Sequence, residues 1–208
     1  MIGFFRAFEF NMKKTFILIA ALLCACTNNP AQMEGWTERE LSLVNAEGGI
    51  MRVLTIDNEA DTEVLRDTCT DFTAEMLLSG EYHRLAEKMV ATVTSPEQDG
   101  VGIAGPQVGL KRRVVAVQRF DKEGEPFEVY PNIRITAVRG EKQEGPEGCL
   151  SVPNRRGNVL RWRDIDICYT KTDGTETKDT TESITGFTAV IFQHECDHLD
   201  GVLYIDRL

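Results

Sequence analysis

Apolar positions recur with helical spacing at two places in the chain. Leu85, Met89 and Val93 fall at every fourth position between residues 81 and 94, which predicts an amphipathic helix with one buried face. The segment SPEQDG that follows contains proline and glycine, and both residue types end helices. Near the C-terminus the run FTAVIFQHECDHL has a helical period again, and Gly201 stands where such a helix would stop.

Between these two helices the pattern indicates extended chain. The segments RRVVAVQRF, FEVYPNIRITAV and NVLRWRDIDICYT are predicted strands, and Asp173-Gly174 marks a turn before one further extended piece. The segment MRVLTID, residues 51–57, is predicted to be a first strand or an extended segment. This order of elements favours the α+β class, with mostly antiparallel sheets packed around the C-terminal helix.

The N-terminal pattern is that of an export signal. Lys13 and Lys14 precede an apolar run from Phe16 to Cys26, which is too short to span a bilayer but suits a signal-peptide core. The Leu-Cys-Ala-Cys sequence at its end resembles a bacterial lipoprotein cleavage box, in which Cys26 becomes the lipidated first residue. Cleavage of an ordinary signal peptide at a nearby small residue is the alternative.

These patterns divide the chain into three parts. Residues 1–25 are predicted to be the signal peptide, residues 26–49 a polar tether, and residues 50–208 the folded domain. Within the tether, TERELSLVN is predicted to form a short helix. We therefore expect an exported, membrane-anchored lipoprotein of a bacterial cell envelope, with a cytoplasmic location as the alternative.

Composition limits the partners. The chain has 208 residues, of which 42% are hydrophobic and 27% charged, as in globular proteins with a substantial core. A net charge of −10 and the lack of a long basic run disfavour a nucleic-acid partner. Four of the six cysteines lie in the predicted domain, without the spacing of a disulfide framework: Cys69, Cys149, Cys168 and Cys196. We expect that they are not all paired and that Cys196 faces the core.

The segment FQHECDHLDG contains two of the three histidines of the chain. His194 and His198 are four residues apart, so on a helix both imidazoles can reach one divalent metal. Glu195 lies beside them and can take a proton from the attacking water, as in His-Glu-x-x-His hydrolases. The alternative is a chance match, but the helix is largely apolar, and buried imidazoles and carboxylates without partners are costly.

The third ligand must come from elsewhere in the chain. Many zinc proteases place a third histidine just downstream, where this chain has Tyr204. The best candidate is Cys149 in GPEGCLSVP, because one thiolate with two imidazoles suits Fe(II) or Zn(II).

Three separated stretches, GVGIAGPQVG, EGCLSVP and QHECDHLDG, resemble in order and spacing the three signature motifs of peptide deformylases. The resemblance runs from about Met51 to Leu208. It implies a deformylase-like fold and a metal-dependent hydrolase that removes the formyl group from N-formyl-Met peptides and releases formate.

The resemblance also implies roles for individual residues. Glu195 would be the general base and acid, while Gln107 and the backbone N–H of Leu150 would bind the formyl oxygen. One divalent metal is implied, with Fe(II) expected and Zn(II), Ni(II) or Co(II) as the other possibilities. The remaining implied residues are Cys149, His194 and His198 as metal ligands, Gly100, Val101 and Gly102 as the edge that pairs with the substrate backbone, and Arg156 as the organiser of the cysteine loop.

The chain departs from the family pattern at Gly105, where many members have alanine, and we expect this glycine to loosen its loop slightly. The export signal also departs from the cytoplasmic place of deformylation on nascent chains. Two other functions stay open at this point: a metallopeptidase that uses the same helix, and an exported module that binds formylated N-termini without catalysis.

Overall fold

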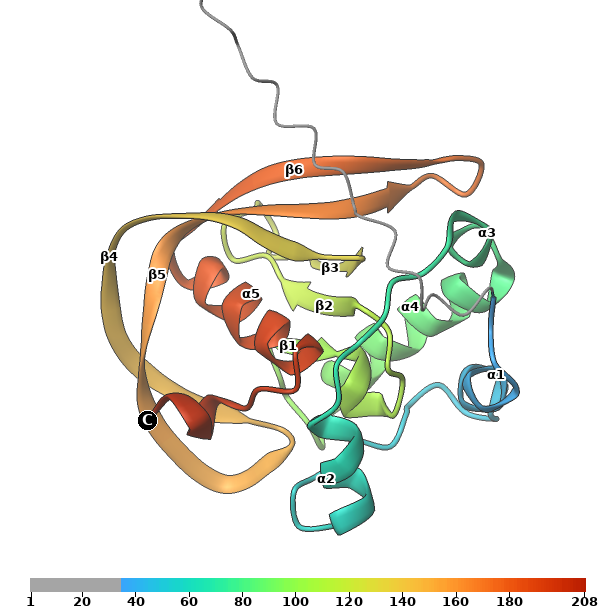
Figure 1. Cartoon of the computed structure of the whole chain (residues 1–208), viewed down its shortest axis with the longest axis horizontal. Coiled ribbons are helices and arrows are strands. Elements are labelled where there is room, and N and C mark those ends of the chain that lie inside the picture. The colour runs from blue at the N-terminus through green and yellow to red at the C-terminus, as the bar shows by residue number, and fades with distance from the viewer. Residues whose placement is uncertain (1–34) are drawn as a thin grey trace, which may run out of the picture.

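Both predicted amphipathic helices are present in the computed structural model, which describes residues 35–208 (Figure 1). They are α4, Gly80–Val93, and α5, Gly186–Leu199. The Ser79 hydroxyl caps α4 by accepting a hydrogen bond from the backbone N–H of Tyr82. Leu85, Met89 and Val93 are fully buried, so the helical period correctly identified the core face of this helix.

α5 ends where the sequence predicts. Gly201 adopts a left-handed conformation with φ of 72°, and the N–H of Val202 donates to the carbonyl of Asp197 at 2.9 Å. A Cβ at position 201 would collide with the carbonyl oxygen of Arg66, so this stop requires glycine.

Two antiparallel sheets of three strands each enclose α5 (Figure 1). The first contains β1, β2 and β3 in that order, with β1 at an edge. The second contains β4, β5 and β6 in that order. The strands span Gly102–Ala104 (β1), Val114–Gln118 (β2), Phe127–Pro131 (β3), Arg134–Cys149 (β4), Val152–Thr172 (β5) and Thr177–Thr185 (β6). Apolar residues from both sheets meet Phe192 of α5 in one buried cluster, which confirms the α+β expectation.

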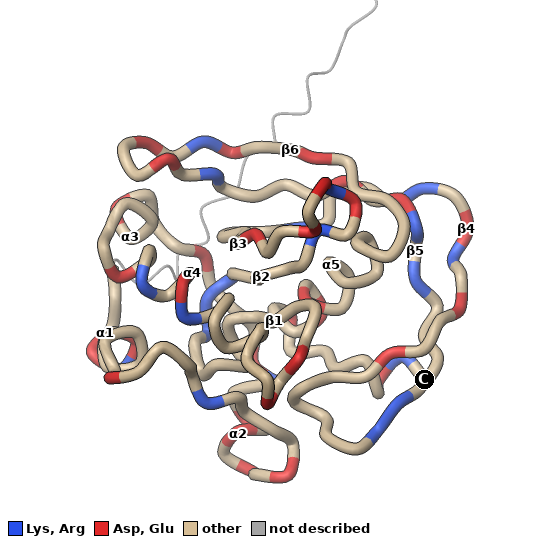
Figure 2. The backbone as a smooth tube through the Cα atoms, turned by 180° about the vertical axis from the view of Figure 1, so that it is seen from behind, with Lys and Arg blue, Asp and Glu red and all other residues tan. Residues whose placement is uncertain are grey.

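β4 and β5 are longer than their hydrophobic patterns indicate. Residues 139–144 of β4 are exposed, so no alternation of buried and exposed positions marks them as a strand. Pairing with β5 holds them extended, and Figure 2 shows positive and negative positions interspersed along both strands.

Residues 51–57, expected to be a first strand or an extended segment, do not form a strand. Two of its backbone N–H groups bond instead to two loops: Leu54 N–H donates to the Gln107 carbonyl at 2.8 Å, and Ile56 N–H donates to the Ser151 carbonyl at 3.0 Å. The segment therefore joins two loops without forming a ladder.

Three shorter helices and two 3₁₀ turns complete the described residues, and no helix among residues 35–208 is long and apolar enough to cross a bilayer. The remaining bounds are Glu38–Asn45 (α1), Glu59–Leu65 (α2), Ala74–Leu77 (α3), Gly105–Val108 (η1) and Tyr204–Arg207 (η2).

α1 is the helix predicted within the tether, but this part of the chain is packed and not solvated. Val44 is fully buried, and Trp36 packs edge-on against Phe72. Glu40 caps its own helix and also accepts a hydrogen bond from Nε of the buried Arg112 at 2.6 Å. The prediction that residues 26–49 form a solvated tether is therefore wrong for residues 36–45, since the folded unit includes them.

Glu40→Ala should lower the free energy of unfolding by about 3 kcal/mol, because it leaves the Arg112 guanidinium buried without its carboxylate. Urea unfolding of this variant checks the value. Glu38→Ala on the exposed side of α1 is the matched control and should change stability by less than about 0.5 kcal/mol. Equal stability of the two variants would mean that α1 does not stabilise the domain.

The described cysteines agree with the sequence expectation. Cys69, Cys149 and Cys196 are free thiols, and Cys196 lies in the core beside Phe192. The expectation for Gly105 is wrong, because a methyl group there would lie 2.6 Å from the Arg112 carbonyl oxygen and 2.9 Å from that of Leu110. This loop is closed tightly around the glycine and is not loosened by it.

Candidate metal centre and active site

Three predicted ligands meet at one point of the structure. Cys149 is the last residue of β4, and His194 and His198 lie one turn apart on α5. One donor atom from each lies within 4.8 Å of the other two, and the Cys149 Sγ is 3.2 Å from the His198 Nε2. The hairpin between β4 and β5 thus brings a thiol onto the helix face that carries both imidazoles.

The donor set fits a divalent metal. A thiolate and two imidazoles from rigid elements match the three-ligand sites that keep one position open for chemistry. Burial lowers the pKa of His198 well below its ordinary value, aided by the charge of His194, so His198 is neutral as a ligand must be. Burial also opposes charge on His194, but hydrogen bonds with Cys149 and Glu147 outweigh it and raise the pKa of His194.

His194 is oriented by residues that the sequence interpretation did not identify. Its Nδ1 bonds the Glu147 carboxylate at 2.8 Å, which directs Nε2 toward the other ligands. The Nε of Arg161 donates a hydrogen bond to that carboxylate at 2.8 Å, and an Nη of the same arginine donates to the Asp197 carboxylate on α5 at 2.6 Å. Burial alone would raise the pKa of Glu147, but bonds from His194 and Arg161 lower it to about 2. Glu147 is therefore ionised at neutral pH, and its carboxylate bonds the Nδ1 of His194.

Glu195 lies beside the ligands with only 4% of its surface exposed. Its Oε2 has no hydrogen-bond partner among residues 35–208, and burial raises the pKa of this carboxyl to about 7. A neighbouring divalent cation would favour the carboxylate form. A Cβ on Gly102 would lie 2.5 Å from Oε1, so β1 passes directly over this side chain.

Gln107 is held in one orientation. Its Oε1 accepts a hydrogen bond from the backbone N–H of Ala104 at 2.8 Å, which leaves only the amino group to face the site. That Nε2 lies 3.6 Å from the Cys149 Sγ and 3.2 Å from the Ser151 hydroxyl. Leu150 follows Cys149 in the hairpin turn, outside the ladder, so its N–H does not pair with β5.

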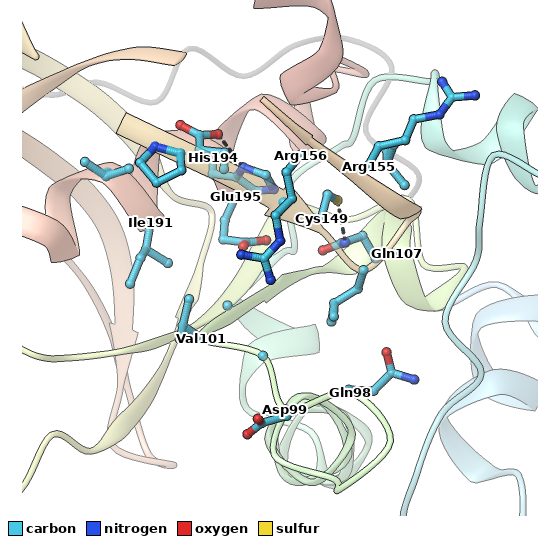
Figure 3. Close-up of a pocket in the computed structure, with 18 of the residues that line it drawn as sticks. Gln98, Asp99, Val101, Gln107, Cys149, Arg155, Arg156, Ile191, His194 and Glu195 are labelled. Atoms are coloured by element: carbon cyan, nitrogen blue, oxygen red, sulfur yellow. Dashed lines mark hydrogen bonds and ion pairs between the residues drawn. The ribbon is translucent and has the colours of Figure 1, made fainter. Parts of the chain in front are cut away.

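A groove of about 840 Å³ contains these groups (Figure 3). Glu195, His194 and Cys149 lie at its centre, with Gln107 beside Cys149 and Val101 on the facing wall (Figure 3). Every site residue predicted in the described part of the chain lines this groove except His198, which is buried behind Cys149. Cys26, the predicted lipidation site, lies outside the described residues.

The family model for polypeptide deformylase matches residues 50–208. The chain belongs to the peptide deformylase family. A peptide deformylase of Leptospira biflexa is 36% identical over 173 residues, covering 76% of this chain and 88% of that protein. Peptide deformylase 2 of a Nostoc strain is 44% identical over 131 residues, covering 60% and 70%.

Solved peptide deformylases have the same fold. The Thermotoga maritima enzyme aligns with a TM-score of 0.65 and 31% identity, over 76% of this chain and 97% of its own. A Met-Ala-Ser-bound deformylase of Acinetobacter baumannii aligns with a TM-score of 0.66 and 32% identity, over 76% and 98%. The chain is accordingly a metal-dependent hydrolase that removes the N-formyl group from peptides, and neither a peptidase nor a non-catalytic module is favoured.

Arg156 differs from its predicted role in the deformylase site. It is exposed and makes no hydrogen bond or ion pair with residues 35–208, although its side chain lies against Gly148. The buried arginine that organises the cysteine loop is Arg161, through Glu147. Arg156 instead extends over the groove (Figure 3).

Glu147→Gln should lower metal affinity by about 10–100-fold, because the amide cannot keep both the Arg161 pair and the charge behind His194. Competition with a chromogenic chelator measures the affinity. Glu144→Gln, at an exposed position of β4, is the matched control and should bind as the parent does. Equal affinity of both variants with the parent would remove Glu147 from the metal site.

Proposed function

We propose that Cys149, His194 and His198 hold a single Fe(II) ion, that Glu195 transfers the proton during deformylation, and that Gln107 binds the oxyanion. The observation that carries this proposal is the convergence of three donor atoms within 4.8 Å, beside one buried carboxylate and one oriented amide. A divalent metal bound there supplies Lewis-acid chemistry, which activates water near neutral pH and polarises a carbonyl.

Glu195 is placed to carry the proton. It takes the proton of the attacking water and delivers it to the amine that leaves when the formamide C–N bond breaks. The pocket around it keeps bulk water away from the transfer, since the side chain is almost fully buried. Gly102 allows the carboxylate to lie directly against β1, where the substrate backbone would run.

Gln107 and the Leu150 N–H are placed to bind the developing oxyanion. The Gln107 amino group points at the site because Ala104 occupies its oxygen, so no reorganisation is needed during the reaction. Removal of one such donor typically costs about 2.7–4 kcal/mol of transition-state stabilisation.

The edge strand β1 supports the binding of an extended peptide. β1 pairs with β2 on one side only, and Gly100, Val101 and Gly102 line the groove on the other. A substrate backbone can add to this edge as a further strand. Ile191, Val190 and Phe187 form an apolar wall suited to a methionine side chain.

The test is product analysis with formyl-Met-Ala-Ser. The proposal predicts formate and intact Met-Ala-Ser in equal amounts, and no product from unformylated Met-Ala-Ser. Release of free amino acids from either peptide would instead indicate a peptidase. Reconstitution of the metal-free protein with Fe(II), Zn(II), Ni(II) or Co(II) under anaerobic conditions compares the metals, and a higher rate with another metal would argue against iron.

We also propose that the enzyme is exported and anchored through a lipid on Cys26. The support is the order of basic residues, short apolar run and cleavage box in the N-terminal sequence. Two acyl chains would anchor the domain stably. Fractionation of the parent and a Cys26→Ser variant tests this, since only the variant should be soluble. Parent protein found in the cytoplasm would contradict export.

A further inference from the structure

An irregularity in the second sheet places two arginines over the groove. Glu147 pairs with Gly157 and Cys149 pairs with Val152, so a single residue of β4, Gly148, faces the four residues 153–156 of β5. Asn154 in this bulge has a φ of 59°. Bulges of this kind redirect side chains, often beside active sites. Here the redirected side chains are Arg155 and Arg156, and both line the groove.

These two arginines have no counter-charge. Both are exposed, and neither makes an ion pair or hydrogen bond within residues 35–208. Two other arginines of the long strands are paired, Arg139 with Asp164 and Asp166 and Arg161 with Glu147, whereas the Arg163 Nε is buried without a hydrogen-bond partner among the described residues. The net charge of the chain is −10, so these two positive side chains are opposite in sign to the chain as a whole.

The wall of the groove that contains Arg155 and Arg156 carries a positive charge. Glu147 pairs with the Arg161 guanidinium and bonds the His194 Nδ1, and Glu195 lies buried at the floor. The acidic group on the opposite wall is Asp99, on the loop after α4. Figure 3 shows the Arg156 side chain extending toward the groove centre and the Arg155 side chain pointing away from it.

We propose that Arg155 and Arg156 make this enzyme select formylated peptides that carry a carboxylate downstream of the methionine. This inference rests on the proposed function of the groove. The carboxylate has two possible sources, an acidic side chain or the free C-terminus of a short peptide, and guanidinium groups bind both in the same way.

The effect should fall on KM and not on kcat. The carboxylate lies away from the bond that breaks, so its contact with the arginines is equally strong in the bound substrate and in the transition state. The side chains are exposed, which makes each charge contact weak, and together they should favour a charged peptide by about five-fold. Because the contacts are exposed, salt should reduce this preference.

The experiment compares kcat/KM for four peptides with the metal-loaded enzyme. Formyl-Met-Ala-Asp-amide against formyl-Met-Ala-Asn-amide tests the side chain, and formyl-Met-Ala-Ser against its C-terminal amide tests the terminus. We expect the charged member of at least one pair to be preferred about five-fold through KM, with less preference at 0.5 M salt. The pair that shows the preference identifies the source of the carboxylate.

Four substitutions test whether the arginines cause the preference for the charged peptide. Arg155→Gln/Arg156→Gln should bring both ratios near one, Asp99→Asn should increase the preference, and Arg84→Gln on α4 should leave the ratios unchanged as a remote control. Ratios near one in the parent, or a preference that survives in the double variant, would overturn the proposal. If no peptide releases formate, the proposed function fails instead, and calorimetric binding of the same peptides still measures the selectivity.

Discussion

Glu195→Gln is expected to lower the rate of formate release by about 10²–10⁴-fold while the metal content stays that of the parent. The amide has nearly the shape of the carboxylate and is not one of the three ligands, so the site should still load. It cannot accept and return a proton, and the Oε2 of Glu195 has no hydrogen-bond partner among the described residues.

Formate release at matched metal content measures this loss. Glu195→Asp is the informative companion, because it keeps the proton chemistry but withdraws the carboxylate from β1, and its rate should fall between those of Glu195→Gln and the parent. A Glu195→Gln rate within about three-fold of the parent would exclude proton transfer by this residue, which normally contributes far more.

Gly102→Ala is expected to reduce deformylation by about 100-fold or more, although the substitution adds only one methyl group. That methyl would lie 2.5 Å from the Glu195 Oε1 and 2.9 Å from the Ile191 Cγ2. Both neighbours belong to α5, so either the carboxylate or the edge strand must move. Metal content should not change, because the atoms nearest to the added methyl group belong to Glu195 and Ile191 and not to the three ligands.

Gly49→Ala is the matched control, since a Cβ there has no atom within 4 Å. A double-mutant cycle identifies the route of the loss: if Gly102→Ala acts through Glu195, adding it to Glu195→Gln should cost little more. Full additivity of the two losses would show that Gly102 acts on substrate binding alone. Unchanged activity of Gly102→Ala would contradict the observed closeness of β1 and Glu195.

The two histidine ligands could be predicted from the sequence because residues four positions apart lie on the same face of a helix. The end of α5 at Gly201 could be predicted for a similar reason, since it depends on the conformation of one glycine. The helices α4 and α5 were predictable for the same reason.

The supporting residues were not predictable, because they depend on pairing between distant strands. Glu147 reaches Arg161 only through the register of β4 and β5, which no local pattern encodes on exposed strands. The bulge after Val152 likewise decides that Arg156 lies over the groove and Arg161 in the interior.

Polarity misled the interpretation of residues 36–45. Few of these residues are apolar, but Val44 and Trp36 pack on the core and Glu40 pairs with a buried arginine from far along the chain. The signal peptide and the lipid anchor lie outside the described residues and stay predictions.

The most direct test of the metal centre is the metal content of purified Cys149→Ala, measured together with formate release. The parent should contain one metal per chain, and Cys149→Ala should lose most of the metal and most of the formate release. Cys69→Ala removes a buried thiol outside the groove and should retain both. A Cys149→Ala protein with full metal content and full activity would contradict the assignment of the metal centre.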